Sequence, residues 1–325
     1  MAHFLTIIVP VYKVEDCVQR CLESIAKQTF ADFECLVIDD GSPDNSGRIC
    51  DEFAKTDARF RVIHQENQGL SGARNTALAV AKGDLVGFVD SDDWVEPTMY
   101  ECMVALLDEH NADVVMCDYL SERGGVAEVE GTGVQVYTGH AFTEKILKDE
   151  YGSQLWKFLY KKPLWDGIVS PARRHAQDMM ILHQVTNRAS TVVVTDEKLY
   201  GYNDTRETNI SNSAKNAVKN KLDRALAFFG RMDFAYEYNY ADNIKRNVIN
   251  QAIGFAINGF FDNTVKEERY AADVRTIREY LKKYKREIRQ YATRRDYRLR
   301  CVLIRLNVSL YLAVYGAYSK LFQGK

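Results

Sequence analysis

Two hydrophobic periods alternate along residues 1–120. Short apolar runs rich in β-branched residues, which predict buried strands, are separated by segments whose apolar positions have helical spacing. The predicted strands are Phe4–Val11, Glu34–Ile38, Arg61–His64, Asp84–Val89 and Asp113–Cys117, and the predicted helices are Cys17–Gln28, Ser46–Lys55, Ser71–Ala81 and Pro97–Glu109. Strands and helices in this order predict an α/β fold in which helices flank a mostly parallel sheet.

The pattern changes twice further along the chain. Residues 121–143 are rich in glycine and alternate in polarity, which predicts a loop or hairpin. Residues 144–200 mix helical spacing with short strands such as Val192–Val194, and from about residue 214 the pattern is helical without a proline. We therefore expect a sheet-containing region, 1–213, followed by a helical region, 214–325.

Composition and charge narrow the possible classes of protein. With 325 residues, 46% of them hydrophobic, and only 5 prolines, the chain is neither disordered nor fibrous. The formal net charge of −2 conceals an asymmetry, because residues 266–325 contain 16 Lys and Arg but 6 Asp and Glu, a net charge of +10. The charge of the chain as a whole does not indicate a nucleic-acid-binding protein.

Cysteines, histidines and apolar stretches suggest a cytoplasmic location. The 7 cysteines include no CxxC pair and the 6 histidines are scattered, so zinc-site spacing is missing and reduced thiols are expected. The N-terminus lacks the basic region of a signal peptide. The longest uncharged stretches, 247–261 and 306–319, are shorter than the roughly 20 residues of a membrane-spanning helix.

Candidate binding residues follow the predicted strands, because ligands of such sheets bind beyond the carboxyl ends of the strands. The first strand ends in Pro10-Val11-Tyr12 without glycine, which excludes a dinucleotide-binding GxGxxG turn, and no phosphate-binding GxxxxGK[ST] loop is present. Asp39 and Asp40 follow the second strand, where either can accept hydrogen bonds from a base or a ribose. The alternative is helix capping, in which Asp40 simply binds turn amides.

A glycine-containing helix start and an acidic turn add phosphate and metal chemistry. The segment Gln68–Asn75 opens a helix whose free amides, with Arg74, suit an anion, although Arg74 could instead be a surface residue. After the fourth strand, Asp90, Asp92 and Asp93 lie within four residues and repel one another unless a cation intervenes. Mg²⁺ or Mn²⁺ suits such ligands; the alternative is an acidic turn in which Asp93 caps the next helix.

Four segments in this order resemble glycosyltransferase family 2, which has the GT-A fold: VPVY at 9–12, VIDDGSPD at 37–44, NQGLSGARN at 67–75 and GDLVGFVDSDDW at 83–94. The resemblance covers roughly residues 4–118 and implies that 1–118 binds a nucleotide sugar and 119–213 an acceptor. The resemblance implies that the donor is a nucleotide sugar, with a UDP-sugar as the first expectation. It implies that the nucleoside diphosphate is held by Pro10, Tyr12, Asp39, Asp40 and Arg74. Asp90 would contact the ribose, and Asp92 would bind the metal ion.

The resemblance continues less strongly into the acceptor half. LWKFLYK at 155–161 is similar to a W-x-K-L-Y stretch, in which Lys157 would neutralise the diphosphate or contact the acceptor; otherwise Lys157 is a surface lysine. In His175-Ala176-Gln177-Asp178, Asp178 matches the catalytic base of the family, whereas Gln177 replaces the usual Glu. The Q-x-x-R-W motif of processive synthases is absent, which favours a non-processive transferase.

The resemblance therefore implies a metal-dependent, inverting glycosyltransferase. It would move a sugar from a nucleotide-diphosphate donor to a saccharide or lipid-linked saccharide, in the assembly of a bacterial surface polysaccharide. The alternatives are a non-catalytic nucleotide-sugar-binding relative, which Gln177 would favour, and a nucleotidyltransferase, whose Gly- and Arg-rich first loop is missing after Val11.

The basic C-terminal region admits two main interpretations. Residues 266–305 are rich in Arg, Lys and Tyr, and an apolar series follows: Val302, Leu303, Leu306, Leu310, Leu312 and Val314. Such a segment suits peripheral contact with the inner face of the plasma membrane. The alternative is a helical bundle whose apolar stripe packs against the catalytic domain; an RNA-binding tail is a third reading, but no RNA-binding module accompanies the charge.

Overall fold

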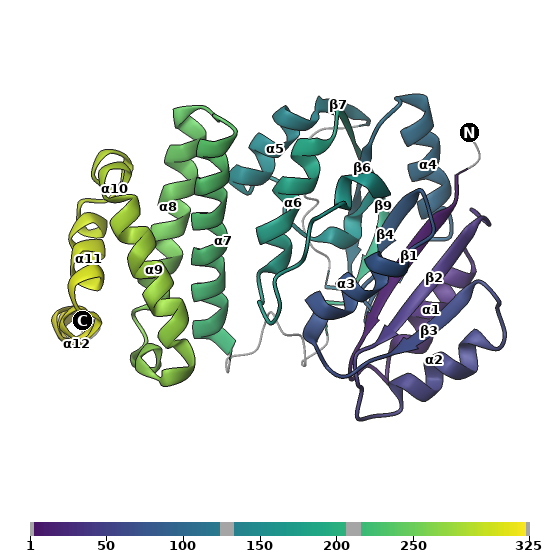
Figure 1. The fold of residues 1–325 in the computed structure, drawn as a ribbon, viewed down its shortest axis with the longest axis horizontal. Coiled ribbons are helices and arrows are strands. Elements are labelled where there is room, and N and C mark those ends of the chain that lie inside the picture. Colours follow the sequence, from purple (N-terminus) through teal and green to yellow (C-terminus); the bar gives the residue numbers. More distant parts are fainter. Residues whose placement is uncertain (1–2, 124–132, 206–215, 323–325) are drawn as a thin grey trace. The chain divides into compact units, whose positions relative to one another are not determined.

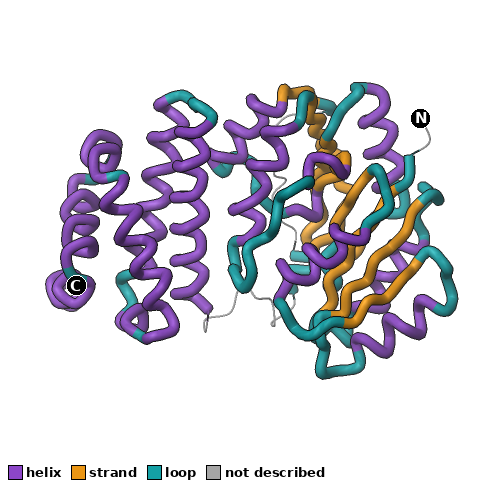
Figure 2. The backbone as a smooth tube through the Cα atoms, in the orientation of Figure 1, coloured by secondary structure: helices purple, strands orange, loops and turns teal. Residues whose placement is uncertain are grey.

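The computed structural model describes residues 3–123, 133–205 and 216–322 (Figure 1). The chain divides into two compact units. The first comprises Met1–Arg173 and Ile181–Arg206, and the second comprises Arg174–Met180 and Glu207–Lys325. The boundary predicted between residues 213 and 214 lies outside the described residues. Figure 2 shows that the described strands belong to the first unit, whereas the second unit is helical.

The described strands of the first unit form one sheet in the order β3-β2-β1-β4-β8-β6-β9-β5, with β7 paired to β9. Strands β3, β2, β1 and β4 are parallel; β8 runs antiparallel to both β4 and β6, and β6 is parallel to β9. The predicted α/β class with a mostly parallel sheet is confirmed. The strands are β1 Leu5–Val11, β2 Phe33–Asp39, β3 Phe60–His64, β4 Leu85–Phe88, β5 Trp94–Val95, β6 Val114–Ser121, β7 Gln135–Thr138, β8 Phe158–Lys161 and β9 Thr191–Tyr202.

Helices cover the sheet, so its central strands are buried on both faces. Every residue of β1 is buried, which explains its uninterrupted apolar run. Leu5, Ile7 and Val9 join the apolar residues of α1 and α4 in one core cluster. The helices of this unit are α1 Val18–Ala26, α2 Ser46–Ala54, α3 Gly69–Val80, α4 Met99–Glu109, α5 Gly139–Lys148 and the part of α6 Gln177–Arg188 that begins at Ile181, with short 3-10 helices at Leu155–Lys157 and Lys162–Trp165.

The predicted strands and helices of residues 1–120 are confirmed, apart from small shifts at their ends. β6 continues past residue 118, the predicted limit of the nucleotide-binding half, and ends at Ser121. Within the predicted loop 121–143, β7 and the start of α5 are visible, while 124–132 lie outside the described residues. Val192–Val194 belongs to β9, a strand of 12 residues.

The second unit is built from the helices α7 Ala217–Glu237, α8 Asp242–Gly259, α9 Ala271–Lys283, α10 Lys285–Tyr291, α11 Arg295–Leu306 and α12 Val308–Phe322, with 3-10 turns at Asn263–Lys266 and Glu268–Tyr270. The facing sides of α7 and α8 bury Leu222, Phe228, Ile249 and Ile253 completely. Among the described residues, none of the helices combines the length and the hydropathy that crossing a membrane requires.

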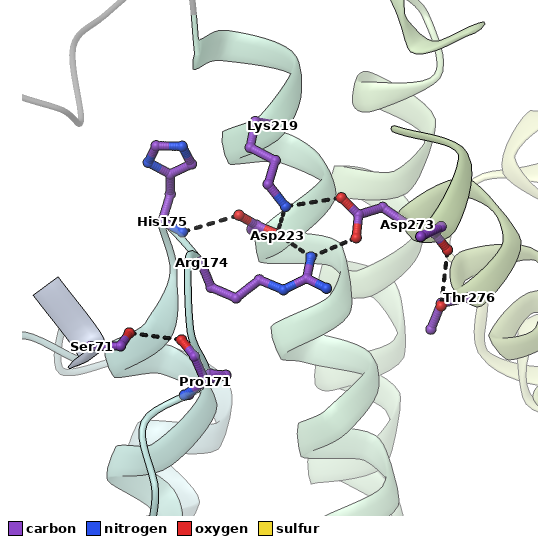
Figure 3. A network of polar contacts seen from close by, with 9 residues as sticks. Ser71, Pro171, Arg174, His175, Lys219, Asp223, Asp273 and Thr276 are labelled. Atoms are coloured by element: carbon purple, nitrogen blue, oxygen red, sulfur yellow. Dashed lines mark hydrogen bonds and ion pairs between the residues drawn. The ribbon is translucent and has the colours of Figure 1, made fainter. Parts of the chain in front are cut away.

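A network of two cations and two carboxylates ties the short segment 174–180 to the helices of the second unit (Figure 3). The Arg174 guanidinium donates to Asp223 Oδ1 at 2.7 Å and to Asp273 Oδ1 at 2.6 Å, and Lys219 Nζ lies 2.7 and 2.9 Å from the same two carboxylates. Asp223 is fully buried. Burial alone would raise the pKa of Asp273, but its bonds to Lys219 and Arg174 hold that pKa below the ordinary value.

We expect Asp223→Asn to lower the free energy of unfolding by about 3 kcal/mol, because it leaves two cations facing one carboxylate in a buried site. Glu52→Gln is the matched control: Glu52 also pairs with a cation four residues away, but its side chain is 57% exposed, against 0% for Asp223. The control should change stability by about 0.5 kcal/mol or less. Urea denaturation followed by circular dichroism measures both, and equal losses would contradict the role of burial.

Candidate active site

The carboxyl ends of β1, β2 and β4 bring the predicted binding residues to one edge of the sheet. Val11 is paired with Asp39 in the β1–β2 register, and the amide of Asp40 donates to the Val11 carbonyl at 2.9 Å. β4 lies on the other side of β1 and leads into Asp90. Pro10 is buried within β1, whereas Tyr12, just beyond the strand, is 44% exposed.

The acidic turn after β4 is held in place by the far end of β9. The amide of Asp93 donates to the Asp90 carbonyl at 3.0 Å. Asp93 is buried, and its two carboxylate oxygens accept from the Tyr200 hydroxyl at 2.7 Å and from the Asn203 amide at 2.8 Å. The same Tyr200 hydroxyl accepts from the Asp90 amide at 3.1 Å. One buried hydroxyl therefore fixes both ends of the turn.

The crowding of carboxylates predicted from the sequence is present in this turn. The pKa of the Asp93 carboxyl lies well above its ordinary value because of its burial and then because of the charges of Asp92 and Asp90. The alternative in which Asp93 caps the following helix is wrong: α4 is preceded by Thr98, and Asp93 binds β9 instead. Asp90 and Asp92 are partly exposed.

Arg74 neutralises part of this charge from α3. Its side chain is 1% exposed, so the alternative of a surface arginine is wrong. One guanidinium nitrogen donates to Asp90 Oδ1 at 2.9 Å, and the guanidinium carbon lies 5.7 Å from the centre of the Phe88 ring. The pair joins the helix that follows β3 to the turn that follows β4.

Asp40 fixes the start of that helix. Its carboxylate accepts from the Gln65 side chain at 2.6 Å, from the Gln68 amide at 2.9 Å and from the Gly69 amide at 2.7 Å. Gly69 has a φ of +78°, a conformation that favours glycine. Asp40 is 2% exposed, so these contacts agree with the alternative in which it binds turn amides. Through them it positions α3.

Asp39 is shared between its own turn and two neighbouring elements. It accepts from the Ser42 amide at 3.1 Å, and its second oxygen lies 2.9 Å from His64 Nδ1 on β3. A Cβ atom at Gly47 would come within 2.6 Å of that second oxygen, so α2 approaches Asp39 closely only because residue 47 is glycine. His64 Nε2 lies 3.0 Å from Asp51.

Polar residues of α3 also hold the segment that precedes Arg173. The Ser71 hydroxyl donates to the Pro171 carbonyl at 2.7 Å (Figure 3). The Asn75 amide side chain donates to the Ser170 carbonyl at 3.0 Å and accepts from the Ser170 amide at 2.9 Å. The polar residues of NQGLSGARN thus form hydrogen bonds with the protein's own backbone as well as with Asp90.

Lys157 and Asp178 have different surroundings. Lys157 is completely buried and its ammonium lies 5.8 Å from the centre of the Phe158 ring, so it is not the surface lysine of the alternative reading. Contact with a ligand would require that this side chain become accessible. Asp178 is partly exposed in the first turn of α6 and, like the buried Gln177, belongs to the second unit, whereas the strand-end residues belong to the first.

Three residues that support the acidic turn were not predicted from the sequence. Besides Tyr200, they are Trp94, which pairs with Gly201 across β5 and β9, and Arg20, whose guanidinium lies 3.7 Å from the centre of the Trp94 ring. A Cβ at Gly201 would lie 1.9 Å from Trp94 Cε2, so the indole occupies that space. A glycine between Tyr200 and Tyr202 in a strand is the signal that could have indicated a close approach.

The donor set of the turn fits a hard divalent ion that substrate oxygens complete. Within the described residues, no group of three or more His, Cys, Asp and Glu side chains forms a metal-binding cluster by itself. Mg²⁺ in nucleotide sites is held by one or two carboxylates together with phosphates and water, so such a cluster is not required. Asp93 binds Tyr200 and Asn203, so Asp92 and Asp90, which are partly exposed, are the residues of the turn that would hold such an ion.

The second unit contains an open pocket of about 480 Å³. It is lined by Asn243, Arg246, Asn247, Asn250, Gln251 and Thr293. None of these is a predicted site residue.

Comparison with known proteins identifies the family. Residues 6–153 match the family described as Glycosyl transferase family 2. The chain is 34% identical over 216 residues to the glycosyltransferase GlyG of Streptococcus pneumoniae, covering 62% of this chain and 71% of GlyG. The chain belongs to glycosyltransferase family 2. It is also 35% identical over 214 residues to the uncharacterized glycosyltransferase EpsJ of Bacillus subtilis, covering 63% of this chain and 62% of EpsJ, less than two thirds of that protein.

Solved structures show the same fold at low sequence identity. Residues 1–349 of Staphylococcus aureus TarS in complex with UDP-GlcNAc match with a TM-score of 0.76 and 23% identity, over 98% of this chain and 92% of that one. A mannosyltransferase of Pyrobaculum calidifontis in complex with GDP-Man and Mn²⁺ matches with a TM-score of 0.54 and 16% identity, over 94% and 88% of the two chains. This member of glycosyltransferase family 2 therefore has the predicted GT-A fold.

The contacts of His64 predict a pH-dependent contribution to stability. Its hydrogen bonds to Asp39 and then to Asp51 raise its pKa above the ordinary 6.5. A raised pKa in the folded state means that this stabilisation is fully present below pH 6.5 and is lost as the pH rises through the folded-state value. The melting temperature of the wild type should therefore exceed that of His64→Gln by more at pH 6 than at pH 8.

Thermal melts at the two pH values measure this difference, with His110→Gln, just after α4, as the control histidine. A difference between wild type and His64→Gln that does not change with pH, or one that grows toward pH 8, would contradict the assignment.

Proposed function

We propose that this glycosyltransferase is a metal-dependent, inverting enzyme that transfers a sugar from a nucleoside-diphosphate donor to a hydroxyl of a saccharide or lipid-linked saccharide. The observation that carries the proposal is the acidic turn at the end of β4, in which Asp90 is bound by Arg74 while Asp92 remains partly exposed. A UDP-sugar is the proposed donor, supported by the UDP-GlcNAc in the TarS structure. The proposed setting is surface-polysaccharide assembly at the cytoplasmic face of a bacterial membrane.

The strand-end residues are proposed to contact different parts of the donor. The nucleoside is proposed to contact Pro10, at the end of β1, and the exposed Tyr12 that follows the strand. Asp39, on the neighbouring strand, is proposed to contact it as well. Asp90 is proposed to accept from a ribose hydroxyl, while Arg74 offers positive charge near the diphosphate. Asp40 contributes by holding the α3 N-terminus, whose orientation places Arg74.

Asp92 is proposed to hold Mg²⁺ or Mn²⁺ together with diphosphate oxygens, and the bound ion would neutralise charge on the departing diphosphate. The mannosyltransferase complex with Mn²⁺ supports a divalent ion in a protein of this fold. Preorganised positive charge at the leaving group usually contributes most to such reactions. Tyr200 and Asn203 keep Asp93 in place, so the turn does not have to rearrange when a donor binds.

The proposed reaction is a single displacement. The acceptor oxygen forms a bond to the anomeric carbon while the bond from that carbon to the diphosphate oxygen breaks, and the electron pair leaves with the diphosphate. Asp178 is proposed to take the proton of the acceptor hydroxyl. A carboxylate of ordinary pKa near 4 suffices, because the hydroxyl becomes acidic only as its new bond forms. One displacement inverts the configuration of the sugar.

We expect Asp178→Asn to reduce turnover by about two orders of magnitude or more while leaving the affinity for UDP nearly unchanged, since the amide cannot take a proton. The measurement is release of UDP from a panel of UDP-sugars in the presence of oligosaccharide acceptors. Asp242→Asn is the control, because Asp242 also lies in the first turn of a helix and its side chain is 77% exposed. Near-normal turnover of Asp178→Asn would show that another group is the base.

We expect Asp92→Asn to abolish the dependence of UDP affinity on Mn²⁺. Isothermal calorimetry of UDP with and without Mn²⁺ measures this, and the wild type should bind about tenfold or more tightly with the ion. Glu66→Gln, an exposed change of equal charge, should leave that ratio unaltered. A ratio that persists in Asp92→Asn would overturn the metal role of this residue.

A further inference from the structure

The last two described helices expose an apolar surface. Leu299, Val302 and Leu306 on α11 and Leu310 and Val314 on α12 are each between 39% and 62% exposed. On α11 the three exposed apolar residues are spaced by three and four positions, so they share one face of the helix. The opposite face is also apolar, because Cys301 and Ile304 are buried. α11 is therefore apolar on two sides, one of which faces solvent.

On α11 itself, the exposed charges that continue this surface are positive. The exposed face of α11 continues toward its N-terminus with Arg295 and Arg298, and both side chains are exposed. Asp296 is bound by Arg294 at 3.2 Å and by Arg300 at 3.2 Å. From Tyr297 to Phe322 the sequence contains no Asp or Glu. The exposed described positions at the start of α12 are Ser309, Leu310, Ala313 and Val314, none of them charged.

The apolar series that the sequence shows divides by burial. Val302, Leu306, Leu310 and Val314 are each exposed. Leu312 is buried at 8% exposure and Leu303 is partly buried, so these two serve the core of the second unit. The series thus divides into residues that pack inside and residues that face outward.

We propose that this surface, formed by Arg295, Arg298, Leu299, Val302, Leu306, Leu310 and Val314, docks on the headgroup region of an anionic lipid bilayer. Exposed leucines flanked only by arginines are the combination that inserts into a bilayer interface, where the apolar side chains enter the acyl boundary and the cations meet lipid phosphates. The net charge of +10 on residues 266–325 attracts the same kind of surface over a longer range. The proposal does not depend on the catalytic assignments, because binding is measured without a donor.

Vesicle co-sedimentation of the full chain tests the proposal. Vesicles of phosphatidylcholine containing 30% phosphatidylglycerol should bind the protein, and vesicles of phosphatidylcholine alone should bind it about tenfold or more weakly. Leu306→Ser with Leu310→Ser should reduce binding to the anionic vesicles about tenfold or more, because the two most central leucines no longer enter the acyl boundary. Both positions are exposed, so folding should be little affected.

Matched controls separate this surface from general effects. Val136→Ser with Val169→Ser removes two exposed apolar side chains from the first unit and should leave binding unchanged. Arg295→Gln with Arg298→Gln should weaken binding to anionic vesicles about tenfold, whereas Lys27→Gln with Lys82→Gln, two exposed lysines of the first unit, should not.

Three results would overturn the proposal. They are absence of binding to anionic vesicles, binding that the leucine substitutions leave intact, and equal weakening by the control pairs. Sedimentation velocity tests whether a second copy of the chain binds this surface instead. The membrane assignment is wrong if no vesicles are bound and the wild type forms a dimer that Leu306→Ser with Leu310→Ser abolishes.

Discussion

The structure depends on how the first unit offsets the electrostatic repulsion among three carboxylates in a single turn. Asp90, Asp92 and Asp93 follow a fully buried strand, so their mutual repulsion acts where water screens it poorly. The protein offsets part of this repulsion, because Asp90 binds the buried Arg74 and Asp93 binds Tyr200 and Asn203. The remaining repulsion favours a bound cation, which is the physical argument for the metal-assisted diphosphate site proposed at Asp92.

The partners of this turn come from distant parts of the sequence. Arg74 lies on α3, and Asp40 fixes the N-terminus of that helix. The pairing of β2 with β1 in turn determines the position of Asp40. Tyr200 lies on β9, 107 positions from Asp93. Because each of these groups is buried, the loss of one partner leaves another polar group unsatisfied, so the site is also a stabilising element of the sheet.

The parallel part of the fold could be predicted from the sequence, whereas the rest of the sheet could not. β1 to β4 are buried on both faces or adjoin helices with clear periodicity, so their apolar runs identify them. β8 is short, follows a 3-10 helix and runs antiparallel between β4 and β6, and no local pattern specifies that position. The role of Tyr200 likewise depends on the register of β9, which is a long-range property.

For the site, residue type alone does not predict which contacts each of several similar residues makes. Asp39 and Asp40 are adjacent and chemically equal, yet Asp40 is taken up by the amides before α3 while Asp39 bonds to Ser42 and His64. Lys157 has the charge that a diphosphate would attract, but a lysine's burial depends on tertiary packing and is not visible in its sequence context. The exposed leucines of α11 and α12 show the same limit, because apolar residues at helical spacing serve either a core or an outer surface.

The central claim is that the acidic turn binds the diphosphate of a nucleotide sugar through a divalent ion. A crystal structure determined with UDP and Mn²⁺ tests it most directly. The account predicts an anomalous Mn²⁺ peak within about 2.0–2.6 Å of an Asp92 oxygen and of diphosphate oxygens. Well-ordered UDP with no ion at residues 90–92 despite saturating Mn²⁺, or UDP bound away from the ends of β1, β2 and β4, would contradict it.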